Sequence, residues 1–443
     1  MWNTEDYKNR PNSIWKRAIK WLYPGMRVKR WILLMIVGAI LAAGGFAILV
    51  GPDGLITFGR KITSFLRQWK QPIKTPLIRQ AGIVLVATGI FAASLGFRQV
   101  IRSLVIDILP SDPKDLAGII FHKRGLDKEP ALVVIGGGTG LSTLLRGLKG
   151  ETERITAIVT VADDGGSSGR IRSELGIPPP GDIRNTLVAL ANTEPLMEQL
   201  FQHRFNWGQG LQGHSFGNLF IAAMTEITGD FEEAIRASSQ VLAVRGQVLP
   251  STLSSVTLRA EYNDGTTTIG ESLIPQSGKS IHRVFVEPAD CQPVPEAIAA
   301  IEAADAIILG PGSLYTSVLP NLLVREIREA IVNSSAPKIY ICNVMTQPGE
   351  TDGYKASHHI QAILDHAGPG LIDYVIVNTV PIPWDLQERY REKGAVPVEA
   401  DLPEIMALGI TPVEAPVISM TDLVRHDPDR LSEVIHELLW QHF

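Results

Sequence analysis

Six short segments of the sequence combine glycine with hydroxyl, carboxylate, guanidinium or amide side chains, and each lies where an apolar run ends or a helical pattern begins. The first, 136–142, reads Gly-Gly-Gly-Thr-Gly-Leu-Ser and follows the apolar run 131–135. Glycines let backbone N–H groups approach an anion, and a helix start adds positive potential. A phosphate-binding turn is therefore expected, with a turn that binds nothing as the alternative. No Gly-Lys-Ser/Thr follows, so this is not a Walker A loop. The predicted contacts are Gly137, Gly138, Thr139 and Gly140.

The second segment, 163–170, reads Asp-Asp-Gly-Gly-Ser-Ser-Gly-Arg and follows the apolar run 155–161. Asp163 and Asp164 could accept a ribose hydroxyl, as in dinucleotide folds, or hold a magnesium ion that bridges phosphates. A solvated acidic loop is the third interpretation. Hydroxyl and guanidinium groups nearby suit a second anion contact, and the residues concerned are Ser167, Ser168 and Arg170. The prediction is a ligand site with no required cofactor and with Mg²⁺ as a tentative metal on the two aspartates.

Two further segments open predicted helices. Segment 178–185, Pro-Pro-Pro-Gly-Asp-Ile-Arg-Asn, opens a helix expected over 183–191. Asp182 is predicted to contact the ligand, with a purely capping role as the alternative, because it lies where an N-cap belongs. Arg184 and Asn185 are expected to face the same crevice as the first two segments. Segment 214–218, His-Ser-Phe-Gly-Asn, precedes a helix expected over 219–227. It offers His214, Ser215 and Asn218 as ligand contacts, and because no acidic residue is near in sequence, a Ser/His triad is not expected.

The last two segments repeat the pattern of a strand followed by small or polar residues. Segment 310–317, Gly-Pro-Gly-Ser-Leu-Tyr-Thr-Ser, follows the apolar run 306–309, and its predicted contacts are Gly310, Gly312 and Ser313. Segment 343–351, Asn-Val-Met-Thr-Gln-Pro-Gly-Glu-Thr, follows the apolar run 339–341. The amide and hydroxyl groups of Asn343, Thr346 and Gln347 could read a nucleobase or a sugar.

The elements that must position these segments alternate between strands and helices, which predicts an α/β fold: a three-layer αβα sandwich around a Rossmann-like, mainly parallel sheet. The expected strands are 131–135, 155–161, 306–309, 339–344 and 374–378. In an open parallel sheet, ligands bind at the carboxyl ends of the strands. The six segments therefore predict a site for a large, polar, phosphate-rich ligand.

Two regions depart from this alternation. The stretches 256–262 and 266–274 alternate in polarity around Asn263-Asp264-Gly265, a strong hairpin signal, so 249–287 is interpreted as a β-rich insertion. The last stretch, 431–443, reads as an amphipathic closing helix.

Charge is distributed unevenly along the 443 residues, whose net charge is −5. Residues 1–102 hold 16 Lys/Arg and 3 Asp/Glu, whereas residues 103–443 hold 25 and 43. A strongly acidic large region argues against nucleic acid as a partner. The two cysteines, Cys291 and Cys342, exclude a disulfide framework, and no Cys/His cluster suggests zinc.

The basic N-terminal region contains two uncharged apolar runs, 31–52 and 81–97. They predict a membrane helical hairpin, in which Gly38, Gly44 and Gly45 fit close helix packing. A signal peptide and a buried core hairpin are the alternatives. Lys/Arg counts favour both termini inside, so the large domain is expected to be cytoplasmic and anchored to the cytoplasmic membrane.

The predicted organisation has four parts. Residues 1–30 form a basic N-terminal segment, and 31–98 form two transmembrane helices with a basic loop. Residues 99–128 are a linker, and 129–443 form the large α/β domain that carries the six segments. Whether the chain crosses the membrane once or twice stays open.

In combination, the six segments resemble the YvcK branch of the CofD-like family, whose members are called gluconeogenesis factors. The resemblance covers about residues 130–440. It implies an αβα sandwich that binds a UDP-sugar, typically UDP-N-acetylglucosamine, and acts in carbon metabolism and cell shape. It also implies that 136–140 and 310–313 hold the diphosphate. The related transferases move 2-phospholactate from a guanosine diphosphate donor to a deazaflavin alcohol with magnesium, which they bind at the position of Asp163 and Asp164.

The leading hypothesis is thus a membrane-tethered UDP-sugar-binding regulator, with protein partners in cell-wall or carbon metabolism that the sequence does not identify. A Mg-dependent transferase is the runner-up, so enzymatic activity is an open question that leans towards none. A dinucleotide oxidoreductase is a third, weaker interpretation, because no catalytic Tyr/Lys or His/Asp pair stands out. Assembly as a homodimer is an open expectation.

Overall fold

The computed structural model describes residues 29–55, 76–108, 129–192, 195–420 and 424–440. The chain divides into two compact units, Met1–Arg124 and Gly125–Phe443. The predicted segment 1–30 lies almost wholly outside the described residues, as do most of the basic loop and the linker.

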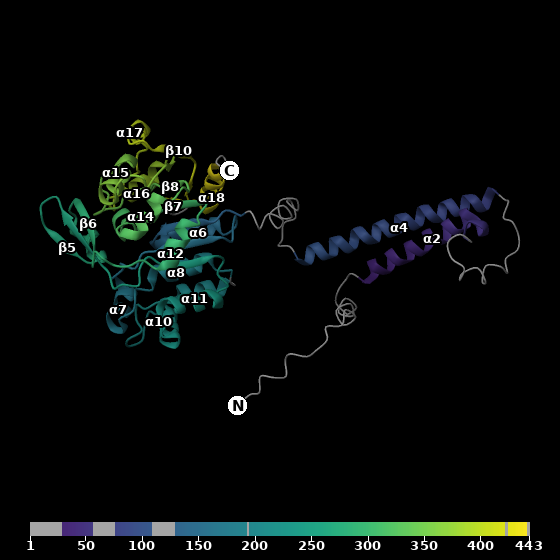
Figure 1. Ribbon diagram of the computed structural model, residues 1–443, viewed down its shortest axis with the longest axis horizontal. Helices are drawn as coiled ribbons and strands as arrows, with labels where there is room; N and C mark the ends of the chain where they lie inside the picture. Colours follow the sequence, from purple (N-terminus) through teal and green to yellow (C-terminus); the bar gives the residue numbers. More distant parts are fainter. Residues whose placement is uncertain (1–28, 56–75, 109–128, 193–194, 421–423, 441–443) are drawn as a thin grey trace, which may run out of the picture. The chain divides into compact units, whose positions relative to one another are not determined.

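The described part of the first unit consists of two long helices, α2 (Lys29–Leu55) and α4 (Pro76–Ile108), which pack side by side (Figure 1). Glycines recur every seven residues along the contact, at Gly38 and Gly45 on α2 and at three positions on α4. A Cβ added to Gly38 would lie 2.5 Å from the backbone N of Ala93, so the backbones approach too closely for any other side chain there. Gly44 has open space around it, so the expectation that it packs between the helices is wrong.

The outer surface of this helix pair is apolar, with Leu33, Ile40 and Phe91 among its exposed side chains. Among the described residues, Gln80–Val100 is long and apolar enough to cross a membrane, judged by length and composition. On α2, Leu33–Leu49 is a shorter apolar stretch. Both predicted apolar runs are helical, and a membrane location stays a prediction.

The second unit is built on a seven-stranded sheet in which every pair is parallel. Its order is β10 (Thr411–Ala415), β9 (Tyr374–Asn378), β8 (Lys338–Ile341), β7 (Ala306–Leu309), β1 (Leu132–Gly136), β2 (Ile155–Val159) and β3 (Gln247–Pro250). From β1 the chain winds outward to β3, and from β7 it winds outward in the other direction to β10. The predicted Rossmann-like fold is confirmed, and the winding reverses between β1 and β7.

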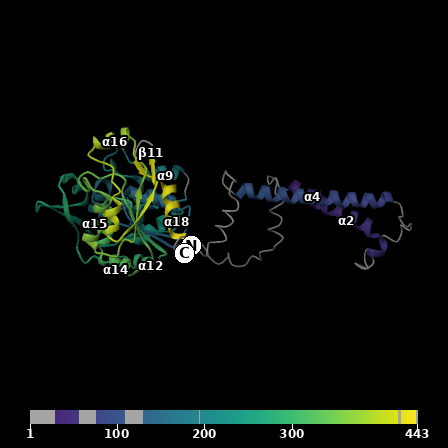
Figure 2. The same ribbon diagram turned by 90° about the horizontal axis from the view of Figure 1, so that it is seen from above.

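Helices cover both faces of this sheet because successive strand side chains point to opposite sides. Leu132 and Val134 belong to one apolar core, and Val133 and Ile135 belong to the other. The first core contains side chains of α6 (Gly138–Leu148), α8 (Gly181–Leu190), α9 (Pro195–Gln202), α10 (Phe216–Thr228), α11 (Phe231–Val241) and α18 (Pro428–Trp440). The second contains α12 (Pro295–Glu302), α13 (Leu319–Leu322), α14 (Arg325–Asn333), α15 (Ala356–Ala367) and α17 (Leu402–Ala407). Figure 2 shows α12, α14 and α15 together on one side of the domain.

The β-rich insertion is an antiparallel sheet of β4 (Thr257–Tyr262), β5 (Thr267–Ile269) and β6 (Ile281–Glu287), drawn at the left of Figure 1. The predicted hairpin is present, but its second strand ends at Ile269 rather than at 274. Gly270, with φ +109°, breaks the strand, and two short 3₁₀ turns follow, η2 (Glu271–Leu273) and η3 (Pro275–Ser277). The insertion also begins later than 249, since Leu249 and Pro250 belong to β3 of the main sheet.

The remaining elements lie in the connections of the second unit. They are α7 (Gly166–Leu175), η4 (Leu314–Val318), α16 (Trp384–Arg391), β11 (Ile418–Met420) and β12 (Val424–His426). Several predicted boundaries shift by a few residues: β2 ends at Val159 and β8 at Ile341, while α8 and α10 begin two and three residues earlier than predicted. Because these helices begin early, residues of the third and fourth polar segments lie in their first turns.

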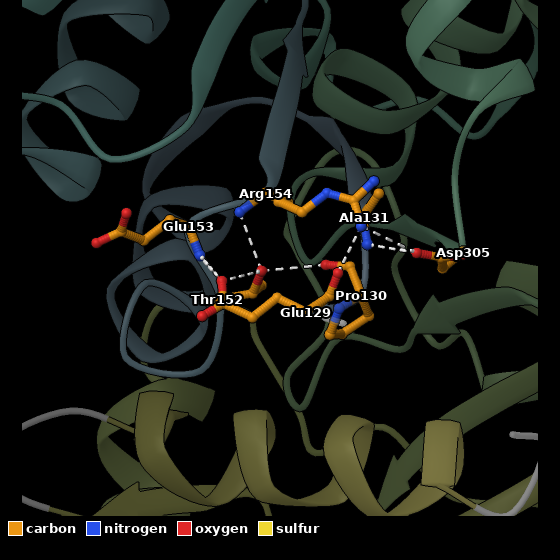
Figure 3. Close-up of polar contacts among 7 residues, drawn as sticks. All are labelled: Glu129, Pro130, Ala131, Thr152, Glu153, Arg154 and Asp305. Atoms are coloured by element: carbon orange, nitrogen blue, oxygen red, sulfur yellow. Dashed lines mark hydrogen bonds and ion pairs between the residues drawn. The ribbon is translucent and has the colours of Figure 1, made fainter. Parts of the chain in front are cut away.

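At the amino ends of β1, β2 and β7, polar side chains hold the chain where it enters the domain (Figure 3). Arg154 Nη1 donates to the carbonyl of Glu129 at 2.6 Å and lies 3.8 Å from Asp305 Oδ2. Thr152 Oγ1 lies 3.2 Å from Glu129 Oε2 and accepts from the N–H of Arg154 at 2.9 Å. We call the side chains of Glu129, Thr152, Arg154 and Asp305 the amino-edge cluster. Each of them makes a hydrogen bond or an ion pair within this group or with the backbone beside it.

Candidate functional site

All six predicted segments lie at the carboxyl edge of the sheet and touch one another. The first and fifth segments meet beside the reversal point, where a Cβ added to Gly140 would lie 2.5 Å from the carbonyl O of Pro311. Gly310 has φ +76°, a conformation that favours glycine, and Gly312 packs against the backbone of Gly137. Gly138, with φ +67°, is the first residue of α6. The topology thus joins two glycine-rich turns that are about 170 residues apart in sequence.

The third segment contacts the first through Asp182. Its carboxylate accepts a hydrogen bond from the N–H of Gly138, and a Cβ on Gly137 would lie 2.7 Å from Asp182 Oδ2. The alternative in which Asp182 only caps its helix is wrong, because α8 begins at Gly181 and Pro180 occupies the N-cap position, while its ligand contact stays a prediction. Burial and the neighbouring carboxylate of Asp163 raise the pKa of Asp182 to about 6.

The second and fourth segments share a buried hydrogen-bond network. Ser167 Oγ lies 3.0 Å from His214 Nδ1 and accepts from Asn218 Nδ2 at 3.1 Å. Asn218 Nδ2 is also 3.4 Å from Ser168 Oγ. Ser215 is the N-cap of α10 and its hydroxyl accepts from the N–H of Asn218. All five side chains are buried, and Asn218 Oδ1 has no partner among the described residues.

Arg184 joins the third segment to the fourth. It is 5% exposed, and its guanidinium donates to Ser215 Oγ at 2.5 Å and to Asn185 Oδ1 at 2.7 Å, while its Nε has no partner among the described residues. Burial, with Arg204 nearby, lowers the pKa of Arg184 to about 10, which leaves it charged at neutral pH. A buried cation with an unpaired N–H suits an anionic ligand.

The sixth segment contacts the fifth through two amide side chains. Asn343 Nδ2 donates to the carbonyl of Gly312 at 2.8 Å, and Gln347 Nε2 donates to Ser313 Oγ at 2.5 Å. Thr346 is placed differently: its buried hydroxyl accepts from the N–H of Val396 at 2.9 Å. Asn343 and Gln347 are thus gathered at the edge, whereas Thr346 holds a neighbouring loop. Their predicted reading of a base or sugar remains a prediction.

The two adjacent aspartates are directed to different partners. Asp163 Oδ1 accepts from the N–H of Gly165 at 2.9 Å, and Asp164 Oδ1 accepts from the N–H of Ser272, in the insertion, at 2.9 Å. No group of three or more His, Cys, Asp or Glu side chains within the described ranges is arranged to hold a metal ion. Mg²⁺ is usually held by one or two carboxylates together with water and ligand phosphates, so it does not need such a group. The tentative magnesium site on Asp163 and Asp164 stays a prediction.

Sequence reasoning missed two carboxylates of the site. Glu271 comes from the insertion, and burial together with Asp163 and Asp182 raises its pKa to about 8. Glu350 is buried in the sixth segment, and burial raises its pKa to about 7 although the N–H of Tyr315 and the hydroxyl of Thr316 donate to it. Glu350 stands within a segment already singled out, whereas no pattern in the sequence marks Glu271.

Two predicted contacts lie at the outer rim. Thr139 is exposed in the first turn of α6, and Arg170 is exposed on α7, where its Nη2 donates to the carbonyl of Gln212 at 2.8 Å. Four helices, α6, α7, α8 and α10, begin within the connected segments. Helix N-termini present unpaired N–H groups and positive potential. Together with Arg184 they give this edge a positive potential that suits an anion, beside the carboxyl groups whose pKa values are raised.

Comparison with known sequences places residues 132–418 in the sequence model described as 2-phospho-L-lactate transferase CofD. A protein from Halalkalibacterium halodurans named gluconeogenesis factor is 57% identical over 311 residues, which covers 70% of this chain and 97% of that protein. One of the same name from Bacillus subtilis is 53% identical over 315 residues, covering 71% and 99%. A relative from Nostoc sp. is 48% identical over 423 residues, covering 94% of this chain and 91% of its own.

Comparison with solved structures finds a similar protein whose fold matches that of the second unit. A crystal structure of a protein from Bacillus halodurans matches with a TM-score of 0.69 and 56% identity. The match covers 70% of this chain and all of that one.

Proposed function

Because this chain belongs to the CofD family, in the branch of the gluconeogenesis factors, we propose that it is a carbon-metabolism factor that binds a UDP-sugar at the carboxyl edge of its sheet. The observation that carries the proposal is the connected set of six segments around Arg184. A diphosphate needs several N–H donors and a positive charge, and this edge offers four helix N-termini and a buried guanidinium.

The proposed ligand is UDP-N-acetylglucosamine, and the first and fifth segments would hold its diphosphate. Their glycines allow the backbone to approach the phosphate oxygens. Amide groups of the sixth segment would contact the sugar or the base. Binding without turnover is the proposed activity, so that ligand occupancy reports the supply of a cell-wall precursor and changes the affinity of a protein partner.

The test is a calorimetric titration of the full chain, purified in detergent, with UDP-N-acetylglucosamine, UDP, GDP and NAD, each with and without Mg²⁺. Tight binding of the UDP-sugar, with the sugar nucleotide recovered intact by chromatography, is the expected result. Arg184→Met should weaken this binding at least tenfold, whereas Arg154→Met at the opposite edge is the matched control. Hydrolysis or transfer of the UDP-sugar would reject a purely binding role.

A transferase is the second candidate, and the raised pKa values of Glu271 and Asp182 favour it. A carboxyl group that holds its proton near neutral pH can act as a general acid. In that case the preferred ligand would be a guanosine diphosphate donor, and Glu271→Gln would abolish turnover while leaving the fold intact. The calorimetric comparison of UDP-sugar with GDP separates the two candidates.

We also propose that α2 and α4 anchor the chain in the cytoplasmic membrane, with the second unit on the cytoplasmic side. The apolar outer surface of the helix pair supports this, because water would otherwise contact Leu33, Ile40 and Phe91. The test is alkaline extraction of cell membranes: the full chain should stay with the lipid, and a chain lacking residues 1–98 should be released. Release of the full chain would reject the anchor.

A further inference from the structure

The hydrogen bonds of Ser167 determine where the proton of a neighbouring imidazole lies. Ser167 Oγ is within hydrogen-bond distance of three nitrogens: Asn218 Nδ2 at 3.1 Å, the backbone N of Ser215 at 3.4 Å and His214 Nδ1 at 3.0 Å. A serine hydroxyl has two lone pairs and a single proton to donate. The two N–H groups occupy the lone pairs, so the hydroxyl proton goes to His214 Nδ1.

An imidazole nitrogen that accepts a hydrogen bond carries no proton, so His214 is neutral and protonated at Nε2. The charged side chains that act on the ring are Arg170 and Glu174, both on α7. Burial is the largest influence and Arg170 the next, and both lower the pKa of His214, while Glu174 opposes them. Hydrogen bonding and electrostatics therefore favour the same neutral ring.

The opposite nitrogen of the ring is left for a ligand. His214 Nε2 has no hydrogen-bond partner among the described residues, and it is not among the buried atoms cut off from solvent. The side chain itself is held firmly, since His214 is 4% exposed and Ser167 is 3% exposed. His214 Nε2–H is therefore a fixed and uncharged hydrogen-bond donor near the proposed ligand site.

We propose that Ser167 is a positioning residue that locks His214 in its Nε2–H tautomer, so that the ring donates to a phosphoryl or sugar oxygen of the ligand. The ligand part of this inference rests on the proposed UDP-sugar site, whereas the tautomer part does not. A ring locked in this tautomer keeps its Nε2–H over the physiological pH range, whereas an unlocked neutral ring can carry its proton on Nδ1 and present a bare Nε2 to the ligand.

The first experiment measures the tautomer directly in the full chain without ligand. Solid-state NMR of protein labelled with ¹⁵N-histidine in lipid vesicles separates protonated from unprotonated ring nitrogens, and the His214 signals are identified as those lost in His214→Gln. The expected spectrum at pH 7 shows an unprotonated Nδ1 and a protonated Nε2. In Ser167→Ala the Nδ1 loses its donor, and a second set of signals from the other tautomer should appear.

The second experiment measures binding of UDP-N-acetylglucosamine between pH 6 and 8. Ser167→Ala should weaken binding by the fraction of rings that lose the Nε2–H, about twofold for an even mixture of tautomers, and make it pH-dependent. His214→Gln should bind within a few-fold of the unaltered chain, because a glutamine amide can supply the same N–H, whereas His214→Leu should not. Equal losses in the glutamine and leucine variants would overturn the donor role.

The two readouts separate the inference from the proposed function. If the His214 ring is protonated at Nδ1, or charged at pH 7, the proposed role of Ser167 is rejected, whatever the ligand is. An Asn218 amide with its oxygen and nitrogen exchanged would give this result, because its oxygen would then accept the Ser167 proton. A correct tautomer without UDP-sugar binding would reject the proposed ligand and, with it, the donor role, while the Ser167–His214 arrangement would stand.

Discussion

At the amino edge of the sheet the Arg154 side chain is 52% exposed and lies 3.8 Å from Asp305, whereas at the carboxyl edge Arg184 is 5% exposed and bonded to Ser215 and Asn185. The charged side chains of Arg154 and Asp305 at the amino edge are 52% and 37% exposed, and the members of the amino-edge cluster pair with one another (Figure 3). The carboxyl edge encloses a cation, several carboxylates with raised pKa values and polar atoms without partners. The same residue types thus pair with one another near the surface at one edge, whereas at the other edge some of their polar atoms are buried without a partner among the described residues.

The largest expected difference between the edges concerns these two arginines. Arg184→Met should lower the free energy of unfolding by about 3 kcal/mol, because it removes charged hydrogen bonds and leaves Asp182 and Asp163 without a nearby cation. Arg154→Met should cost at most about 1 kcal/mol, as exposed ion pairs do. Urea denaturation of both variants, followed by far-UV circular dichroism, measures the two values. Equal losses would remove the distinction between the edges.

Close backbone contact should also be restricted to the carboxyl edge. Gly140→Ala places a Cβ against the backbone of Pro311, and we expect a loss of about 1–3 kcal/mol in stability together with weaker ligand binding. Gly150, in the turn after α6, has a single neighbour near its added Cβ, the Gly147 carbonyl at 3.3 Å, so Gly150→Ala is the matched control. If the two alanine variants unfold at the same denaturant concentration, the close backbone contact between Gly140 and Pro311 is rejected.

The carboxyl edge should make stability depend on pH. Asp182, Glu350 and Glu271 have folded pKa values raised to about 6, 7 and 8, so between their unfolded values near 4 and these values the folded state binds more protons. Stability from these groups is present at low pH and is lost as the pH rises to about 8. The thermal midpoint should therefore fall between pH 5 and pH 8 in the absence of ligand.

Glu271→Gln sharpens this test, because it keeps the shape of the side chain and removes its charge. At pH 8 the variant should unfold several degrees higher than the unaltered chain, because a folded pKa of about 8 lowers stability by about 3 kcal/mol between pH 5 and pH 8. At pH 5 the two unfolding temperatures should nearly coincide. Differential scanning fluorimetry across the range gives both profiles. A variant whose profile runs parallel to that of the unaltered chain would show that Glu271 is not the group that titrates.

The smallest effect is expected at the amino edge. Thr152→Val keeps the buried methyl group but removes the hydroxyl that bonds to Glu129 and accepts from Arg154, which should cost about 1 kcal/mol. Ligand affinity should not change, because the site lies at the other end of the strands. Calorimetric binding to the valine variant checks this; a loss of affinity would mean that the two edges are coupled through the sheet.

The sequence by itself determined the architecture of the second unit and the edge of the sheet at which the six polar segments gather. Uninterrupted runs such as Ile307-Ile308-Leu309 indicate strands buried on both faces, and glycine with polar residues after each run indicates the ligand-binding edge. Those signals are local, because the spacing of apolar residues along the chain and the flexibility of glycine depend only on residues that are close in sequence. The strand β3 was missed because its four residues end in proline and adjoin the insertion.

Only the tertiary structure decided which side chains face one another. Glu271 enters the site because the insertion folds back so that Asp164 bonds to Ser272, and no local pattern encodes a contact between residues more than 100 positions apart. The same holds for Asp182, which reads as a helix cap and instead binds Gly138, and for Thr346, which holds Val396. Periodicity places a residue on an element, but burial, protonation and hydrogen-bond partners depend on the distances between elements, which packing of the whole chain sets.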